Sequence, residues 1–392
     1  MRGAVARAGL AALLIAAGPA AAVEIDIGLI RVARDAPQPI SRLDLPPEDE
    51  GAAGARLGLE DNATTGGFLG HDYALVEAET DAAGAVAALE AMLARDVRMV
   101  LAVADAESQL ALADRAAEAG AVILNVSARD DRLRGADCRA NLLHVAASRR
   151  MLADGLAQYL VWKRWDHWLL ISGEHPADIA QAEAYRLAAR KFGADIEEAL
   201  LFEDTGGARR SDSGHVQVQR QIPVFLQDAE DHDVIVVADE SELFGVYLPY
   251  RTWAPRPVTG DAGLRPVIWH PAHEGYGATQ LQRRFEALAG RRMTEIDFAA
   301  WAAIRAVGEA VTRAGTADPE ALTAYMLGPE FELAAFKGLP LSFRPWSRQL
   351  RQAVLLADGR NVVSLSPQEG FLHQRNRLDT LGVDAPETDC DL

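Results

Sequence analysis

The chain has 392 residues, of which 49% are hydrophobic and 24% are charged, and its formal net charge is −18 at pH 7. This is the composition of a globular protein long enough for two domains with separate cores, and it excludes extensive disorder. The acidic surface that it implies repels nucleic acid, and no stripe of basic residues interleaved with aromatic ones offsets that repulsion.

The first 22 residues differ in composition from the rest of the chain. Arg2 and Arg7 give a positive start, residues 8–18 are apolar, and residues 20–22 are three alanines. This order is typical of a secretory signal peptide, and the apolar run is too short to cross a bilayer. We expect cleavage after Ala22, and we expect no lipid anchor because no Cys follows the apolar run. No later segment has the roughly 18 uninterrupted apolar residues that a membrane span needs.

From residue 23 to about residue 145, strand-like and helix-like segments alternate. Apolar or alternating runs predict strands, and apolar residues three or four positions apart predict helices. Strands are expected over residues 24–30, 73–77, 99–104 and 121–126, and helices over residues 48–62, 82–95 and 107–119. This alternation predicts a parallel sheet with right-handed crossovers and helices on both faces.

The same alternation continues after a crossing segment at residues 141–145. Strands are expected over residues 168–172, 197–202, 234–238 and 266–269, and helices over residues 150–163, 178–192, 216–227 and 241–251. Helices at residues 279–289, 297–314 and 318–327 then return the chain to the first unit, and late strands are expected at residues 339–343 and 353–357. Asp358 and Gly359 are a hairpin-type turn signal, and the polar tail from Ser366 onward is expected to be extended.

The pattern therefore predicts an α/β protein with two Rossmann-like lobes, whose parallel sheets are joined by a three-segment hinge. Lobe I is expected to contain residues 23–144 and 272–335, and lobe II to contain residues 145–271 and 336–392 with the C-terminal tail. Ligands of open parallel sheets bind at the carboxyl ends of the strands. The loops that follow these strands should therefore line a cleft between the lobes.

Polar side chains that follow the expected strands are the first candidates for ligand contact, because such loops can offer side chains and free backbone N–H groups to an anion. In lobe I these candidates are Asp105, Ser108, Asn125, Ser127 and Arg129. In lobe II they are His175, Asp239 and Glu240. Arg129 could instead pair with Asp130 or Asp131, and Asp105 could be a helix N-cap.

Aromatic and basic residues give two further groups of candidates. Trp253, Trp269, Tyr276 and Trp301 lie near the expected return to lobe I. Their rings offer flat apolar faces to a planar ligand, and core packing is the alternative. The Pro-rich segment after the first strand brings Arg42 toward the carboxyl end of that strand, where arginine can hold a carboxylate through two parallel N–H bonds.

The sequence lacks the motifs of common catalytic sites: it has no G-x-S-x-G, H-E-x-x-H, C-x-x-C, P-loop or G-x-G-x-x-G pattern. We therefore predict no catalytic residues and no metal site. Cys138 and Cys390 are the two cysteines of the chain. We expect them to form a disulfide because an exported pair usually oxidises, and two free thiols are the alternative.

Several segments resemble a known family. The Asn-Val-Ser of residues 125–127, the Lys-Arg-Trp of residues 163–165 and the Trp-Leu-Leu of residues 168–170 resemble the leucine/branched-chain amino acid type of periplasmic solute-binding protein, the type I class. Longer segments are similar to a subgroup, the ABC-transporter substrate-binding proteins that accompany alcohol oxidation systems dependent on pyrroloquinoline quinone (PQQ). These segments are GFLGHDYALVEAE (67–79), LPYRTWAPRPV (248–258), FELAAFKGLPLSFRPW (331–346), LRQAVLLADGR (350–360) and SPQEGFLHQRNRLDTLG (366–382).

The resemblance implies the type I periplasmic binding protein fold, a periplasmic location, and a non-catalytic ligand trap that works with an ABC transporter permease. The chain departs from amino acid binders in its first loop, where Arg and Pro replace a Ser-rich turn. The expected ligand is therefore a planar anion, PQQ first, held by Arg42, Arg129 and tryptophans as cargo and not as a catalytic cofactor. The alternatives are an aromatic alcohol or acid, an amino acid, or a role as a periplasmic partner of a quinoprotein alcohol dehydrogenase.

Overall fold

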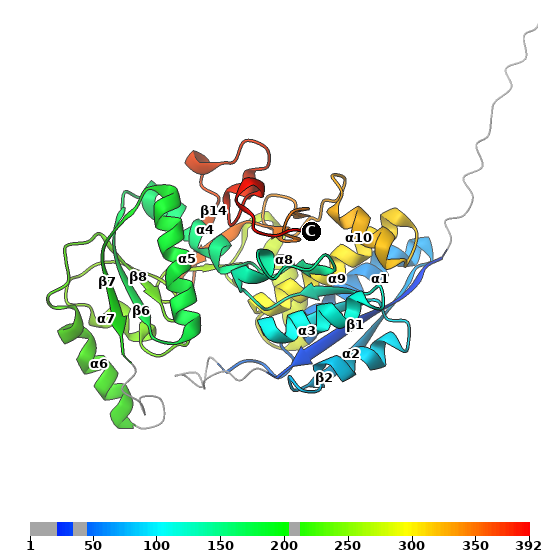
Figure 1. Cartoon of the computed structure of the whole chain (residues 1–392), viewed down its shortest axis with the longest axis horizontal. Coiled ribbons are helices and arrows are strands. Elements are labelled where there is room, and N and C mark those ends of the chain that lie inside the picture. Colours follow the sequence, from blue (N-terminus) through cyan, green and yellow to red (C-terminus); the bar gives the residue numbers. More distant parts are fainter. Residues whose placement is uncertain (1–21, 34–44, 204–211) are drawn as a thin grey trace, which may run out of the picture.

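The computed structural model describes residues 22–33, 45–203 and 212–392, and they form two α/β lobes that lie side by side (Figure 1). The expected signal peptide and Arg42 lie outside the described residues. Within these residues, no helix is both long enough and apolar enough to cross a membrane.

Lobe I is built on a five-stranded parallel sheet with the strand order β2-β1-β3-β4-β5. Its strands are β1 (Glu24–Val32), β2 (Asp72–Thr80), β3 (Met99–Val103), β4 (Val122–Asn125) and β5 (Leu142–His144). Its helices are α1 (Ala52–Gly66), α2 (Ala85–Leu93), α3 (Ala106–Ala117), α8 (Ala278–Ala289), α9 (Glu295–Ala314) and α10 (Pro319–Leu327). Successive side chains of a strand point to opposite faces, so Ile27 and Leu29 share a core with α1 and α9, whereas Ile30 and Val32 share a core with α2 and α3.

A close contact between α1 and α9 fixes one edge of the space between the lobes. A Cβ atom added at Gly54 of α1 would lie 1.9 Å from the carbonyl oxygen of Asp297 in α9, so only glycine fits there. The backbone N–H of Gly51 also donates to the Asp297 side chain over 2.8 Å. The segments that precede these two helices are therefore held next to each other.

Lobe II is built on a four-stranded parallel sheet with the order β7-β6-β8-β9. Its strands are β6 (His167–Gly173), β7 (Asp195–Phe202), β8 (Val234–Ala238) and β9 (Val258–Gly260), and its helices are α4 (Arg149–Trp162), α5 (Pro176–Phe192), α6 (Asp212–Leu226) and α7 (Leu248–Arg251). Leu169 and Val237 face a core shared with α6, and Trp168 and Val236 face one shared with α4 and α5. The two parallel sheets confirm the predicted fold class.

A small antiparallel sheet with the order β10-β13-β14 lies against α4. Its strands are β10 (Arg265–Val267), β13 (Val354–Ala357) and β14 (Val362–Ser366), and a two-stranded ribbon of β11 (Ser342–Phe343) and β12 (Leu350–Arg351) precedes it. Chain segments that cross between the lobes meet here. The side-chain amide of Gln349 donates to the carbonyl oxygens of His144 and Ala146, and Gln352 donates to that of Val145. The exact lobe boundaries stay a prediction.

Two expected elements are wrong. The helix expected over residues 241–251 is reduced to a 3-10 turn at Gly245–Tyr247 and to α7, because the Asp239 carboxylate binds three successive backbone N–H groups of this segment. The tail after Ser366 is not extended. It forms short 3-10 turns, and it buries Leu378 and Asp379.

The predicted disulfide between Cys138 and Cys390 is confirmed, with a Cα–Cα distance of 5.7 Å. It joins positions 252 residues apart in the sequence. Cys138 lies between β4 and β5 of lobe I, and Cys390 lies at the end of the C-terminal tail.

Candidate ligand-binding site

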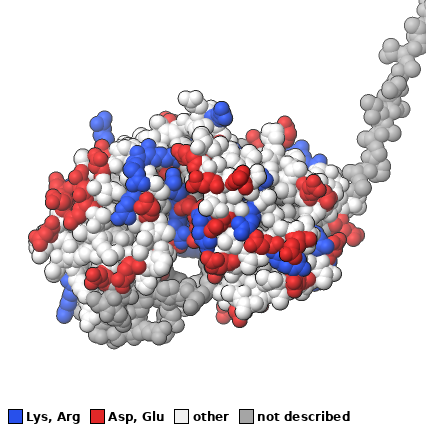
Figure 2. Space-filling model, viewed as in Figure 1, with Lys and Arg blue, Asp and Glu red and all other residues white. Residues whose placement is uncertain are grey.

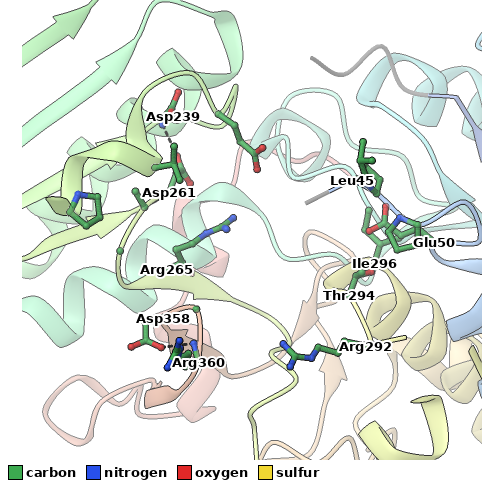
Figure 3. A pocket seen from close by; sticks show the side chains of 18 of the residues that line it. Leu45, Glu50, Asp239, Asp261, Arg265, Arg292, Thr294, Ile296, Asp358 and Arg360 are labelled. Carbon is green, nitrogen blue, oxygen red and sulfur yellow. Dashed lines mark hydrogen bonds between the residues drawn. The ribbon is translucent and has the colours of Figure 1, made fainter. Parts of the chain in front are cut away.

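A cleft of about 1030 Å³ lies between the two lobes (Figure 3). Lobe I lines it with residues that precede α1 and α9, which are Leu45, Pro46, Pro47, Glu50, Arg291, Arg292, Thr294 and Ile296. Lobe II lines it with residues that follow β8 and β9, which are Asp239, Glu242, Val246, Pro249, Tyr250, Asp261, Ala262 and Gly263. The antiparallel sheet adds Arg265, Asp358, Gly359 and Arg360. The cleft thus lies where carboxyl ends of parallel strands are expected to place a ligand.

Two aspartates form the lobe II wall of the cleft. Asp239 is 3% exposed, and its carboxylate accepts N–H groups of Leu243, Phe244 and Gly245 at 2.6 to 2.9 Å. Its own backbone N–H donates to Asp261 over 2.9 Å. Burial raises the pKa of Asp239 to about 6. Burial, together with repulsion from Glu240, raises the pKa of Asp261 to about 7.

Three arginines that line the cleft have no carboxylate partner among the described residues. They are Arg265 at the start of β10, Arg292 between α8 and α9, and Arg360 in the turn between β13 and β14. All three are exposed. The adjacent Arg291 differs, because it pairs with Asp49 at 2.7 Å and with Asp297 at 2.6 Å. Figure 3 shows Arg265 and Arg292 directed toward the space between the lobes.

A network of ion pairs lies beside the cleft, next to Ile296 of its lining. Arg129 pairs with Glu295 at 3.0 Å, and the other oxygen of Glu295 accepts the backbone N–H of Ile268 at 2.7 Å. Glu295 is the main reason that the pKa of Arg129 is raised. Arg149 pairs with Glu240 of lobe II at 2.7 Å and with Asp130 of lobe I at 3.4 Å. The network thus connects residues of both lobes beside the crossing segments.

The comparisons with known proteins agree with this architecture. Residues 47–203 match a family model described as periplasmic binding protein. A branched-chain amino acid ABC transporter periplasmic ligand-binding protein from Burkholderia xenovorans superposes with a TM-score of 0.72 at 15% identity, over 93% of this chain and 99% of that one. The chain has the type I periplasmic binding protein fold. No curated protein matches the sequence.

Two ligand-bound structures share this fold. An ABC transporter substrate-binding protein from Desulfitobacterium hafniense in complex with Leu has a TM-score of 0.66 at 17% identity, over 88% of this chain and 100% of that one. A solute-binding protein of an ABC transporter from Rhodopseudomonas palustris in complex with 3,4-dihydroxybenzoic acid has a TM-score of 0.63 at 13% identity, over 88% and 97%. At these identities the likeness shows the fold of this chain alone.

Within this periplasmic binding protein fold, most lobe I candidates have structural partners. Asn125 is fully buried, and its side-chain oxygen accepts the N–H groups of Ser127 and Ala128. The Ser127 hydroxyl exchanges hydrogen bonds with the backbone of Ala104. Asp105 is the N-cap of α3 and accepts the N–H of Ser108 at 2.7 Å, so the N-cap alternative describes it. Ser127 and Arg129 line a separate cavity of about 20 Å³, which shares Ile296 with the cleft.

The tryptophans do not line the cleft, which corrects their expected role. Trp269 is 2% exposed and stacks on Phe298 with ring centroids 4.8 Å apart. Trp301 is also 2% exposed, and its indole N–H donates to Asp61. Trp253 is 63% exposed, but it lines a separate cavity of about 180 Å³ on lobe II. Trp269 and Trp301 therefore pack in the core, which was the alternative that the sequence left open.

Of the predicted residues that the structure describes, only Asp239 lines the cleft, together with residues that the sequence did not indicate. His175 is exposed at the start of α5 and does not line the cleft. The missed residues are Tyr250, Asp261, Arg265, Arg292 and Arg360. The turn signal at Asp358 and Gly359 could have indicated Arg360, which follows it directly.

Proposed function

We propose that the chain is the periplasmic substrate-binding protein of an ABC-type uptake system. It holds a small ligand between its lobes and presents it to a membrane permease, and it has no catalytic role of its own. The observation that carries this proposal is the cleft of about 1030 Å³, lined by loops of both lobes. The solved structures of the same fold that are described as ABC transporter binding proteins support it.

Basic and acidic side chains both lie on the surface around the junction of the lobes (Figure 2), and the charges of the cleft favour an anionic ligand. Arg265, Arg292 and Arg360 have no carboxylate partner among the described residues, whereas Asp239 and Asp358 already accept backbone N–H groups. Arginine binds carboxylates through parallel N–H bonds and stacks on planar groups. These three arginines have the role that the sequence assigned to Arg129, which pairs with Glu295 instead.

A flat polycarboxylate fits these features best, so PQQ is the first ligand to test. The ring of Tyr250 lines the cleft, is 86% exposed and offers an apolar face to such a ligand. An aromatic monocarboxylate is the second candidate for the same reasons, and an amino acid is the third. A quinoprotein alcohol dehydrogenase as an additional partner rests on the sequence resemblance alone.

Calorimetric titration of the exported protein with PQQ, 3,4-dihydroxybenzoate and leucine tests the proposal. Each of the substitutions Arg265→Gln, Arg292→Gln and Arg360→Gln should weaken binding of a carboxylate ligand by a factor of about 10 to 100, since a hydrogen bond to a charged group contributes about 1.5–3 kcal/mol. Arg256→Gln is the matched control, because Arg256 pairs with Asp231 away from the cleft.

Two results would contradict these assignments separately. If none of the three compounds binds, the proposed ligand classes fail. If one binds and the three arginine variants bind it as tightly as the control does, the arginines do not hold its carboxylate. Binding of leucine alone would favour an amino acid as the ligand over PQQ and over an aromatic monocarboxylate.

A further inference from the structure

The first part of the C-terminal tail is fixed to lobe II. The Ser366 hydroxyl donates to the carbonyl oxygen of Gly155 in α4 at 2.6 Å. Further along, Lys191 of α5 donates to the carbonyl oxygens of Thr380 and Gly382 at 3.0 and 2.8 Å. Because α4 and α5 pack against each other and α5 packs on the lobe II sheet, the tail as far as Gly382 moves with that lobe.

The last part of the tail is bonded covalently to lobe I. Cys390 forms its disulfide with Cys138, which lies in the loop between β4 and β5. This loop is itself held to lobe I: Arg139 pairs with Asp114 of α3 at 2.5 Å, and Asn141 donates to the carbonyl oxygen of Ala113 at 2.8 Å. The two ends of residues 382–390 therefore belong to different lobes.

Residues 382–390 are a short strap. Eight residue steps separate Gly382 from Cys390, and a fully extended chain of that length spans at most about 26–29 Å. A 3-10 turn at Ala385–Glu387, capped by Asp384, shortens the strap further. The indole N–H of Trp346 also donates to the carbonyl oxygen of Val383 at 3.3 Å. Figure 1 shows the tail (red) running over α4 and β14 at the junction of the lobes.

We propose that this strap is a fourth connection between the lobes, closed by the disulfide, and that it restricts the range of inter-lobe arrangements. A hinge made of crossing segments alone leaves the lobes free to rotate and twist, whereas a closed strap excludes every arrangement that separates its two ends beyond its reach. The inference rests on the proposed function in one respect, since it concerns the movement by which the cleft would take up a ligand. Reduction of the disulfide would release the restriction.

The test measures the distance between the lobes without any ligand. Probes are attached to non-natural amino acids at Ala83 in lobe I and at Ala180 in α5 of lobe II, two exposed positions, so that neither cysteine is used. The distance distribution is measured in the oxidised protein, in the same protein treated with dithiothreitol, and in the variant Cys138→Ser/Cys390→Ser. We expect a narrow distribution in the oxidised protein and a wider one, with distances absent before, in the other two.

The control is Trp346→Phe with the disulfide intact, which removes the hydrogen bond to Val383 and should keep the narrow distribution. Superimposable distributions in the oxidised and reduced proteins would overturn the proposal, as would two free thiols in the unreduced exported protein. If the double serine variant does not fold, the comparison of the oxidised and reduced protein decides. A failure of PQQ, 3,4-dihydroxybenzoate and leucine to bind would overturn the proposed ligand classes and leave this result unchanged.

Discussion

Between pH 5 and pH 8, the free energy of unfolding should depend on pH mainly through Asp261. Replacing Asp261 by Asn should therefore remove most of this pH dependence. Burial raises the pKa of Asp261 to about 7 in the folded protein, against about 3.9 in an unfolded chain. The folded state therefore binds this proton more tightly than the unfolded state does. The resulting stability is fully present below the unfolded pKa and is lost as the pH rises through 7.

The size of the effect follows from these two pKa values. Between pH 5 and pH 8 the folded protein should lose about 2–3 kcal/mol of unfolding free energy through Asp261. Asp239, with a pKa raised to about 6, adds a smaller loss in the same direction. Asn at position 261 keeps the shape of the side chain and can still accept the backbone N–H of Asp239, but it carries no charge. The D261N protein should therefore lose much less stability over this range.

Equilibrium urea unfolding at pH 5 and pH 8, followed by tryptophan fluorescence, measures the loss of unfolding free energy in the wild type and in D261N. Asp231→Asn is the matched control, because Asp231 is 95% exposed at its side chain and pairs only with a surface arginine. This control should lose as much stability between the two pH values as the wild type. Equal losses in the wild type and in D261N would refute the argument that the buried charge of Asp261 is the cause.

Other substitutions test the remaining parts of the structure. Asp379→Ala removes the carboxylate that two buried arginines contact at 2.7 and 2.9 Å, and urea unfolding should show a loss of about 3–5 kcal/mol. Arg149→Gln cuts the ion pair between α4 of lobe II and Asp130 of lobe I, and it should widen the inter-lobe distance distribution. Tyr250→Ala should weaken a planar ligand about tenfold in calorimetry, whereas Trp253→Ala should leave its affinity unchanged, because Trp253 lines a different cavity.

Local sequence patterns were sufficient to predict the two parallel sheets, because strand and helix periodicities are properties of neighbouring residues. They failed where a side chain competes with the backbone pattern. The spacing of residues 241–251 suits a helix, but the Asp239 carboxylate takes three N–H groups of that segment. The tail looked extended because it is polar, yet Asp379 pairs with Arg344, which lies 35 residues away.

The site was harder to predict because its residues come together only through the fold. Arg129 was a reasonable candidate on sequence grounds, but its partner Glu295 is 166 residues away and its pairing leaves little reason for ligand contact. Arg265 lies on β10, whose antiparallel partner β13 comes much later in the chain, and no local pattern shows that pairing. The tryptophans were chosen as a group for their chemistry, and long-range packing decided that Trp269 and Trp301 serve the core.

Three arginines of the cleft have no carboxylate partner among the described residues, and they lie on both sides of it. The charge of a ligand should therefore affect how readily the two lobes close on it. Arg292 belongs to lobe I, whereas Arg265 and Arg360 belong to the antiparallel sheet that rests on α4. Movement that brings Arg292 toward the other two brings like charges together, and this repulsion opposes closure of an empty cleft. A bound carboxylate reverses the sign of the interaction, because it attracts arginines of both sides at once. A ligand shifts such an equilibrium only by its difference in affinity for the two states. Anionic ligands should therefore narrow the inter-lobe distance distribution, and Arg292→Gln should reduce that response more than it changes the distribution of the empty protein.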